Sequence, residues 1–136
     1  MDRPEQLRAL AEAAHDEGLT ILERPLPHGL SGAYDLRAGI IYLRRGLSVP
    51  HQVAVLAHEL EHHRRGDDGH QDASTEARIN QAVARWLISP AEYALAEQIA
   101  GGHSGAIALE LDLPRWVVSA YRTRLWDSSP VLLGHK

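Results

Sequence analysis

The sequence contains no cysteine and no phenylalanine among its 136 residues. The absence of cysteine excludes disulfide bonds, cysteine-ligated zinc, iron–sulfur clusters and cysteine nucleophiles. Any metal ion must therefore be bound by nitrogen and oxygen atoms. Only 5% of the residues are aromatic, so the core must be built mainly from alanine and aliphatic side chains.

The sequence also lacks a long hydrophobic run and an excess of positive charge. No segment approaches the ~20 apolar residues that span a bilayer, and residues 1–10 lack the apolar centre of a signal peptide. We therefore expect a cytoplasmic protein with no membrane partner. The formal net charge is −4, whereas proteins that bind the phosphate backbone normally carry a basic face, so direct DNA binding is not expected. Nine histidines are the unusual feature of the composition.

Hydrophobic periodicity and helix-ending residues predict an α+β domain. Three short apolar runs, LTILE, GAYDL and GIIYL, predict a small antiparallel three-stranded sheet whose last two strands form a hairpin. We expect this sheet to pack on the second helix, with further helices C-terminal to it. Residues 1–127 are expected to form one domain and 128–136 a flexible tail. The predicted helices cover residues 2–17, 48–65, 74–88, 91–100, 104–111 and 114–126.

The second predicted helix contains the spacing H-E-x-x-H, formed by His58, Glu59 and His62. Residues four apart on a helix lie on one face, so both imidazoles can reach one metal ion. Glu59 flanks that face and can hold an activated water molecule. The apolar residues of this helix lie opposite the histidines, so one side packs while the other presents ligands.

A catalytic zinc site needs a third protein ligand, for which we favour Glu76 at the start of the third helix. Asn80, one turn later, could accept the second ring N–H of His58 or His62. Two alternatives remain. Asp72 or Ser74 could cap this helix while Glu76 only faces its positive end, or Asp68, six residues after His62, could be the third ligand.

Residues 55–66, VLAHELEHHRRG, and 75–90, TEARINQAVARWLISP, resemble the ImmA/IrrE family of metallopeptidases, particularly the small members from phages and mobile elements. The resemblance spans roughly residues 30–125. It implies a minimal, gluzincin-like zincin fold, with His58, His62 and Glu76 as Zn²⁺ ligands and Glu59 as general base. Ile79 and Ala82 depart from the family pattern at packing positions.

The resemblance further implies a zinc endopeptidase that cleaves a helix-turn-helix repressor and so derepresses a phage or mobile-element operon. Tyr93 or His103 could stabilise the oxyanion in such a reaction. An extended substrate could pair with the sheet edge formed by GAYDL or GIIYL. The alternative function is a non-catalytic, repressor-binding (anti-repressor) module that retains the fold.

Overall fold

The computed structural model describes residues 2–127, with side chains up to residue 123, so the predicted tail at 128–136 lies outside the described residues. The chain folds into two compact units, Met1–Ile79 and Asn80–Lys136, and the boundary between them falls within the sequence of helix α3. The α+β class is confirmed. None of the helices in the described part of the chain has the length and apolar character needed to cross a membrane. The expectation of one domain over residues 1–127 stays a prediction.

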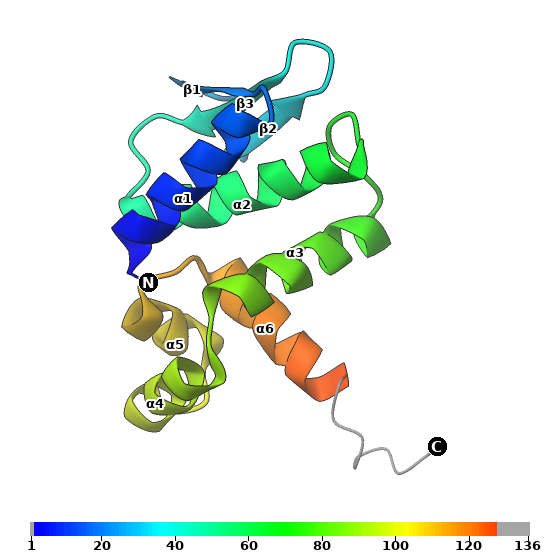
Figure 1. The fold of residues 1–136 in the computed structure, drawn as a ribbon. Helices are drawn as coiled ribbons and strands as arrows, with labels where there is room; N and C mark the ends of the chain where they lie inside the picture. Colours follow the sequence, from blue (N-terminus) through cyan, green and yellow to red (C-terminus); the bar gives the residue numbers. More distant parts are fainter. Residues whose placement is uncertain (1, 128–136) are drawn as a thin grey trace. The chain divides into compact units, whose positions relative to one another are not determined.

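The first unit consists of a three-stranded sheet with two helices on one side (Figure 1). Helix α1 packs on both α2 and strand β1, whereas α2 packs on β2 and β3. The element bounds are α1 Arg3–Asp16, β1 Thr20–Arg24, β2 Gly32–Asp35, β3 Ile40–Arg44 and α2 Val49–Arg65, followed by the beginning of α3, Ala73–Leu87.

The sheet differs from the expected antiparallel arrangement in one pairing. The strand order is β1-β3-β2, with β2 and β3 antiparallel as predicted but β1 and β3 parallel. Residues 25–31 connect β1 to β2, and seven residues can easily cross the roughly 10 Å that separates strands on either side of a central one. Strand β3 is therefore central, and GIIYL cannot offer a free edge, whereas GAYDL in β2 is an edge strand.

Helix α2 has the boundaries that its sequence predicts. The side chain of Ser48 accepts a hydrogen bond from the His51 backbone N–H, and Pro50 occupies the first turn, where its missing donor has no cost. Gly66 ends the helix with φ 78°, a left-handed conformation that suits glycine. The apolar residues Val53, Ala54, Val55, Leu56, Ala57 and Leu60 are buried, and Glu59 and His62 are buried with them.

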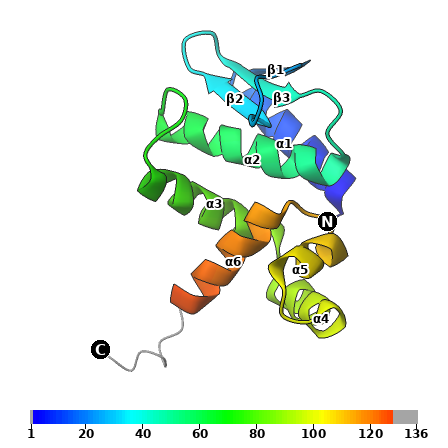
Figure 2. The same ribbon diagram turned by 180° about the vertical axis from the view of Figure 1, so that it is seen from behind.

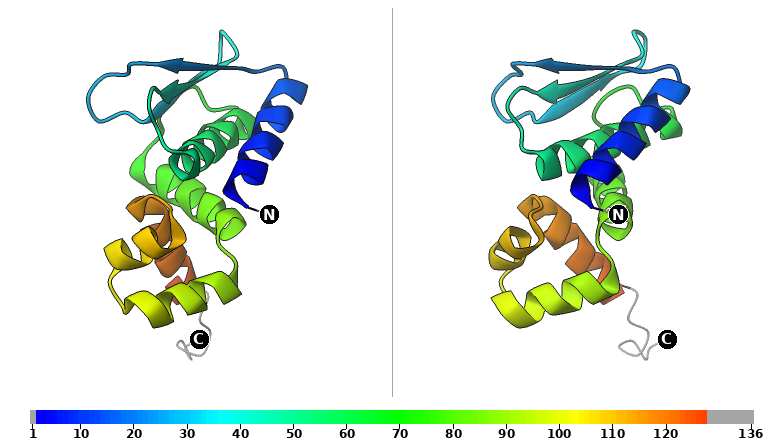
Figure 3. Two further views of the ribbon diagram at one scale, coloured as in Figure 1. Left: turned by 90° about the vertical axis from the view of Figure 1, so that its left-hand side faces the viewer. Right: turned by 60° about the vertical axis from the view of Figure 1, so that its left-hand side comes forward.

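The second unit contains the end of α3 and three further helices, drawn from green to orange in Figure 3. Ser89 and Glu92 form a capping box at the start of α4, where each side chain accepts the other residue's backbone N–H. Helix α5 packs on both α4 and α6. The bounds are α4 Pro90–Ala100, α5 Ser104–Leu111 and α6 Arg115–Asp127.

Candidate metal centre

Helix α2 presents His58 and His62 on one face, as their spacing requires. Their ring centroids lie 4.9 Å apart, close enough for both rings to approach one point. His62 is 1% exposed, which is unusual for a histidine and requires polar partners for its ring nitrogens.

Helix α3 brings the carboxylate of Glu76 to both imidazoles. Glu76 Oε1 lies 3.0 Å from His58 Nε2, and Glu76 Oε2 lies 3.1 Å from His62 Nε2. Asp72 caps the same helix, because its Oδ1 accepts the Thr75 backbone N–H at 2.8 Å. The capping alternative and the ligand role of Glu76 are therefore compatible, since the cap fixes the first turn from which Glu76 extends.

The carboxylate of Glu76 is also held from the loop that precedes α3. The backbone N–H of Gln71 donates to Glu76 Oε2 at 2.7 Å. Burial acts to raise the pKa of Glu76, but this hydrogen bond and the charges of His62, His58 and His70 outweigh it, so the pKa lies below its usual value. Glu76 is thus an ionised, oriented carboxylate at neutral pH.

Asp67 fixes the other ring nitrogen of His62, which contacts Asp67 Oδ2 at 3.0 Å through Nδ1. Burial acts to raise the pKa of Asp67, yet its hydrogen bonds to His62 and Arg65 keep it below the ordinary value, so the carboxylate is ionised and only accepts. His62 Nδ1 must therefore carry the hydrogen. This leaves Nε2 directed at Glu76.

The arrangement of these groups requires a positive charge between them. With a hydrogen on Nδ1, His62 turns Nε2 toward a second acceptor, Glu76, at 3.1–3.2 Å. Two facing lone pairs at that distance repel unless a proton or a cation lies between them. The N–O separations of 3.0–3.2 Å are close to the ~3.3 Å edge of a tetrahedron with ligand bonds of ~2.0–2.1 Å, so the donor set fits a metal ion such as zinc.

His58, His62 and Glu76 together offer three ligand atoms that lie within 4.8 Å of one another. Within the described residues, this is the one group of three or more such side chains close enough to hold an ion. Two nitrogens and one carboxylate leave further coordination positions open, which distinguishes catalytic sites from closed structural sites.

Glu59 lies beside these ligands but is not among them. It is 7% exposed, and burial raises its pKa to about 7, with the positive charge of His62 opposing this rise and the negative charge of Glu76 adding to it. A carboxylate whose pKa is near the working pH can both accept and release a proton. The environment of Glu59 is thus suited to acid–base chemistry.

Strand β2 runs alongside α2 (Figure 2). Its residues lie against Val55, Glu59 and His63 of that helix, so the strand covers Glu59. These three residues follow one another at intervals of four and so share one side of the helix. Gly32 lies against the first two, and the hydroxyl of Tyr34 contacts His63 Nδ1 at 2.8 Å. The edge strand β2 therefore packs directly against Glu59, the candidate general base.

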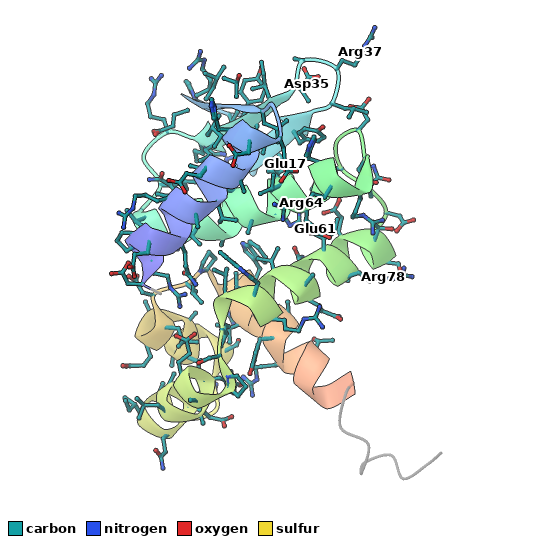
Figure 4. The ribbon with its side chains drawn as sticks, in the orientation of Figure 1. Glu17, Asp35, Arg37, Glu61, Arg64 and Arg78 are labelled. Carbon is teal, nitrogen blue, oxygen red and sulfur yellow. The ribbon has the colours of Figure 1, made fainter. Side chains whose placement is uncertain are left out.

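A charged pair joins the end of α1 to the end of α2. Glu17 Oε2 accepts from Arg64 Nη2 at 2.8 Å (Figure 4), and Glu17 Oε1 lies 3.4 Å from His63 Nε2. His63 is thus held between Tyr34 and Glu17 and belongs to the packing of α2 rather than to the ligand group.

Three further residues predicted to take part in the site, Asn80, Tyr93 and His103, are not among the candidate metal ligands. Asn80 is predicted to accept the second ring N–H of His58 or His62, but its side-chain oxygen is buried with no hydrogen-bond partner among the described residues. The acceptor for His62 Nδ1 is Asp67 instead. Tyr93 is buried, with its ring centroid 4.7 Å from that of Tyr121, and His103 is an exposed residue at the start of α5. Both belong to the second unit, and their roles as oxyanion donors stay predictions.

The alternative third ligand, Asp68, is exposed and does not belong to the ligand group. The role of its neighbour Asp67 was not predicted, although Gly66, the residue that ends α2, offered a sequence signal for it. A left-handed glycine after a helix folds the chain back so that the next residue meets the last turn. The backbone N–H of Asp67 accordingly donates to the His62 carbonyl at 3.0 Å, which places the two side chains together.

Gly32 was the second residue that sequence reasoning missed, and nothing in its surroundings distinguished it from an ordinary strand or turn glycine. Its significance depends on the close approach of β2 to α2, which only the fold reveals.

Comparison with known families supports the chemistry of this site. The model of the "Putative metallopeptidase family (DUF6782)" matches residues 2–93, about two thirds of the chain, and the match includes all three candidate ligand residues and Glu59. The chain belongs to this metallopeptidase family. No curated protein matches the sequence.

Proposed function

We propose that the chain is a zinc-dependent endopeptidase that hydrolyses a peptide bond in a helix-turn-helix repressor, with His58, His62 and Glu76 as zinc ligands and Glu59 as general base. Membership of a metallopeptidase family supports the reaction class. The observation that carries the proposal is the convergence of two imidazoles and a carboxylate from separate helices beside a buried glutamate.

Zinc suits this donor set better than the harder divalent ions. Calcium and magnesium favour oxygen ligands, whereas zinc is commonly held by histidine nitrogens together with a carboxylate. Bound at this site, zinc supplies Lewis-acid polarisation of the scissile carbonyl and lowers the pKa of a water molecule toward ~7.

Glu59 performs the proton transfers in the proposed reaction. Its carboxylate accepts a proton from the attacking water and then delivers it to the nitrogen of the leaving amine, so Glu59 ends in its starting state. The pKa of about 7 lets the same group act in both directions near neutral pH. Asp67 and the Gln71 backbone hold the ligands still while this proton moves.

The free edge of β2 is the proposed binding surface for the substrate. The Arg44 N–H donates to the Ser31 carbonyl at 2.8 Å, so residues 31 and 33 face β3 and the backbone groups of Gly32 and Tyr34 point to the outer edge. An extended substrate that pairs there would lie alongside the strand that covers Glu59.

The repressor as substrate, and the release of a phage or mobile-element operon, follow from the resemblance of residues 55–66 and 75–90 to the ImmA/IrrE family. We test this by incubating the protein with the repressor encoded beside its gene, with and without added zinc. The proposal expects a discrete repressor fragment that forms only when zinc is present, and an intact repressor in the presence of zinc would contradict it.

The variant Glu59→Gln separates catalysis from mere binding. It keeps the size of the side chain but cannot accept the proton, so zinc content should match the wild type while cleavage falls by about 10²–10⁴-fold. If Glu59→Gln still inactivates the repressor, the protein acts as the non-catalytic binding module instead.

A further inference from the structure

We propose that Gly32 of β2 and Val55 of α2 together set how closely the edge strand covers the carboxylate of Glu59, which makes Gly32 a positioning residue for the general base. The inference rests on the proposed function, because it assigns Gly32 a part in the reaction of Glu59.

Gly32 is required by space rather than by backbone conformation. Its φ is not in the left-handed region, so other residues could adopt its backbone angles. A Cβ atom at this position, however, would lie 2.4 Å from Val55 Cγ1 and 3.3 Å from Glu59 Oε2. Carbon atoms in contact normally stay ~3.5–4.0 Å apart, so any side chain must push the strand and the helix apart by roughly 1 Å.

The strand cannot relieve this clash by sliding. Tyr34, two residues along the same face of β2, is attached to His63 at 2.8 Å, and β2 is paired with β3 along its inner edge. The carbonyl of Tyr42 on β3 would also lie 3.2 Å from the added atom. An alanine at position 32 must therefore lift the strand from the helix next to Glu59.

The covering strand matters for the chemistry in two ways. It shields one side of the Glu59 carboxylate, which is 7% exposed, from bulk solvent, and it limits the directions in which that carboxylate can point. Displacements of ~1 Å in a catalytic group can lower a rate by about 10²-fold. The ligands His58 and His62 face another side of α2, so metal binding should not depend on residue 32.

The test compares Gly32→Ala, Val55→Ala and the double variant, all loaded with zinc. The main measurement is the rate at which a water-soluble carbodiimide labels Glu59, followed by mass spectrometry, with Glu61 on the same helix as the internal reference. Zinc content and the kcat and KM for repressor cleavage are measured on the same preparations.

We expect Gly32→Ala to label several-fold faster at Glu59, and its kcat to fall by about tenfold or more. Val55→Ala removes the atom that would lie 2.4 Å away, so the double variant should return to the labelling rate and kcat of Val55→Ala alone. Zinc content should be equal in all variants. A role in stability alone would alter the unfolding temperature but leave the Glu59 labelling rate unchanged.

Three results would overturn the inference: unchanged labelling in Gly32→Ala, no return in the double variant, or loss of zinc in Gly32→Ala. If Gly32→Ala does not fold, Val55→Leu replaces it, because its longer side chain enlarges the residue that faces Gly32 from the helix side. Unchanged labelling in Val55→Leu then overturns the inference. The labelling needs no proteolysis, so an inactive wild-type protein would refute the proposed function without deciding the role of Gly32.

Discussion

Replacement of Asp67 should weaken metal binding although Asp67 is not a ligand. Its carboxylate lies 3.0 Å from Nδ1 of His62, a side chain that is 1% exposed and has little room to reorient by itself. The carboxylate holds the hydrogen on Nδ1 and leaves Nε2 available to the metal. Such partners of metal-ligating histidines typically contribute 10–100-fold to metal affinity, or about 1.4–2.7 kcal/mol.

The two obvious substitutions should differ in a predictable order. Asp67→Asn retains an oxygen that can accept from Nδ1 but loses the charge, so zinc affinity should fall by about tenfold. Asp67→Ala removes the acceptor altogether, and the loss should approach about 100-fold. Zinc affinity is measured by competition with a chromogenic chelator at fixed pH and ionic strength.

Asp68 provides a matched control, because it is the neighbouring residue, carries the same charge and is exposed. Asp68→Asn and Asp68→Ala should bind zinc as the wild type does. If the Asp67 variants also bind normally, the orienting role of this carboxylate is refuted. If the Asp68 variants lose as much affinity, the effect is one of general negative charge near the site.

Three further predictions concern the edge strand, the third ligand and the surface pair. Uncleaved repressor bound to Glu59→Gln should slow amide hydrogen exchange in β2 but not in β1 at the opposite edge; equal protection of both strands, or of neither, argues against edge pairing. Glu76→Gln should weaken zinc binding more than Asp67→Asn does in the same competition assay, because it alters a ligand itself, and an equal or smaller loss would remove Glu76 from the site. Glu17→Gln should lower the free energy of unfolding by less than ~1 kcal/mol, measured by urea denaturation near pH 7. The bond to Arg64 lowers the pKa of Glu17 in the fold, so this difference is present above the unfolded value of ~4.3 and should vanish as the pH falls through the folded value.

Local sequence signals predicted the helices and the common face of His58 and His62 well. Ser48 and Gly66 mark the ends of α2 through side-chain capping and left-handed geometry, which depend only on neighbouring residues. The spacing of His58 and His62 fixes their common face for the same local reason. The position of Glu76 near His58 and His62 depends on how α3 packs against α2, which local signals do not determine. A glutamate in the first turn of a helix was nevertheless a sequence signal for a polar partner.

Features that depend on contacts between distant segments could not be predicted in the same way. The parallel pairing of β1 with β3 was missed because residues 25–31 are compatible with either a neighbouring or a skipped strand. The need for glycine at position 32 arises only from its contacts with Val55 and Glu59, which lie more than twenty residues away along the chain. The role of Asp67 could be predicted only in part. The turn at Gly66 depends on neighbouring residues, but the burial that makes His62 need an acceptor depends on contacts between distant segments.

The central claim is that His58, His62 and Glu76 hold one metal ion beside Glu59. X-ray absorption at the zinc edge of the zinc-loaded protein, repeated on Glu76→Ala, tests it most directly. The account predicts one zinc per chain with two imidazoles and one carboxylate oxygen at ~2.0–2.2 Å, and loss of that oxygen in the variant. A zinc ion bound without imidazole ligands, or a coordination sphere that Glu76→Ala leaves unchanged, would contradict it.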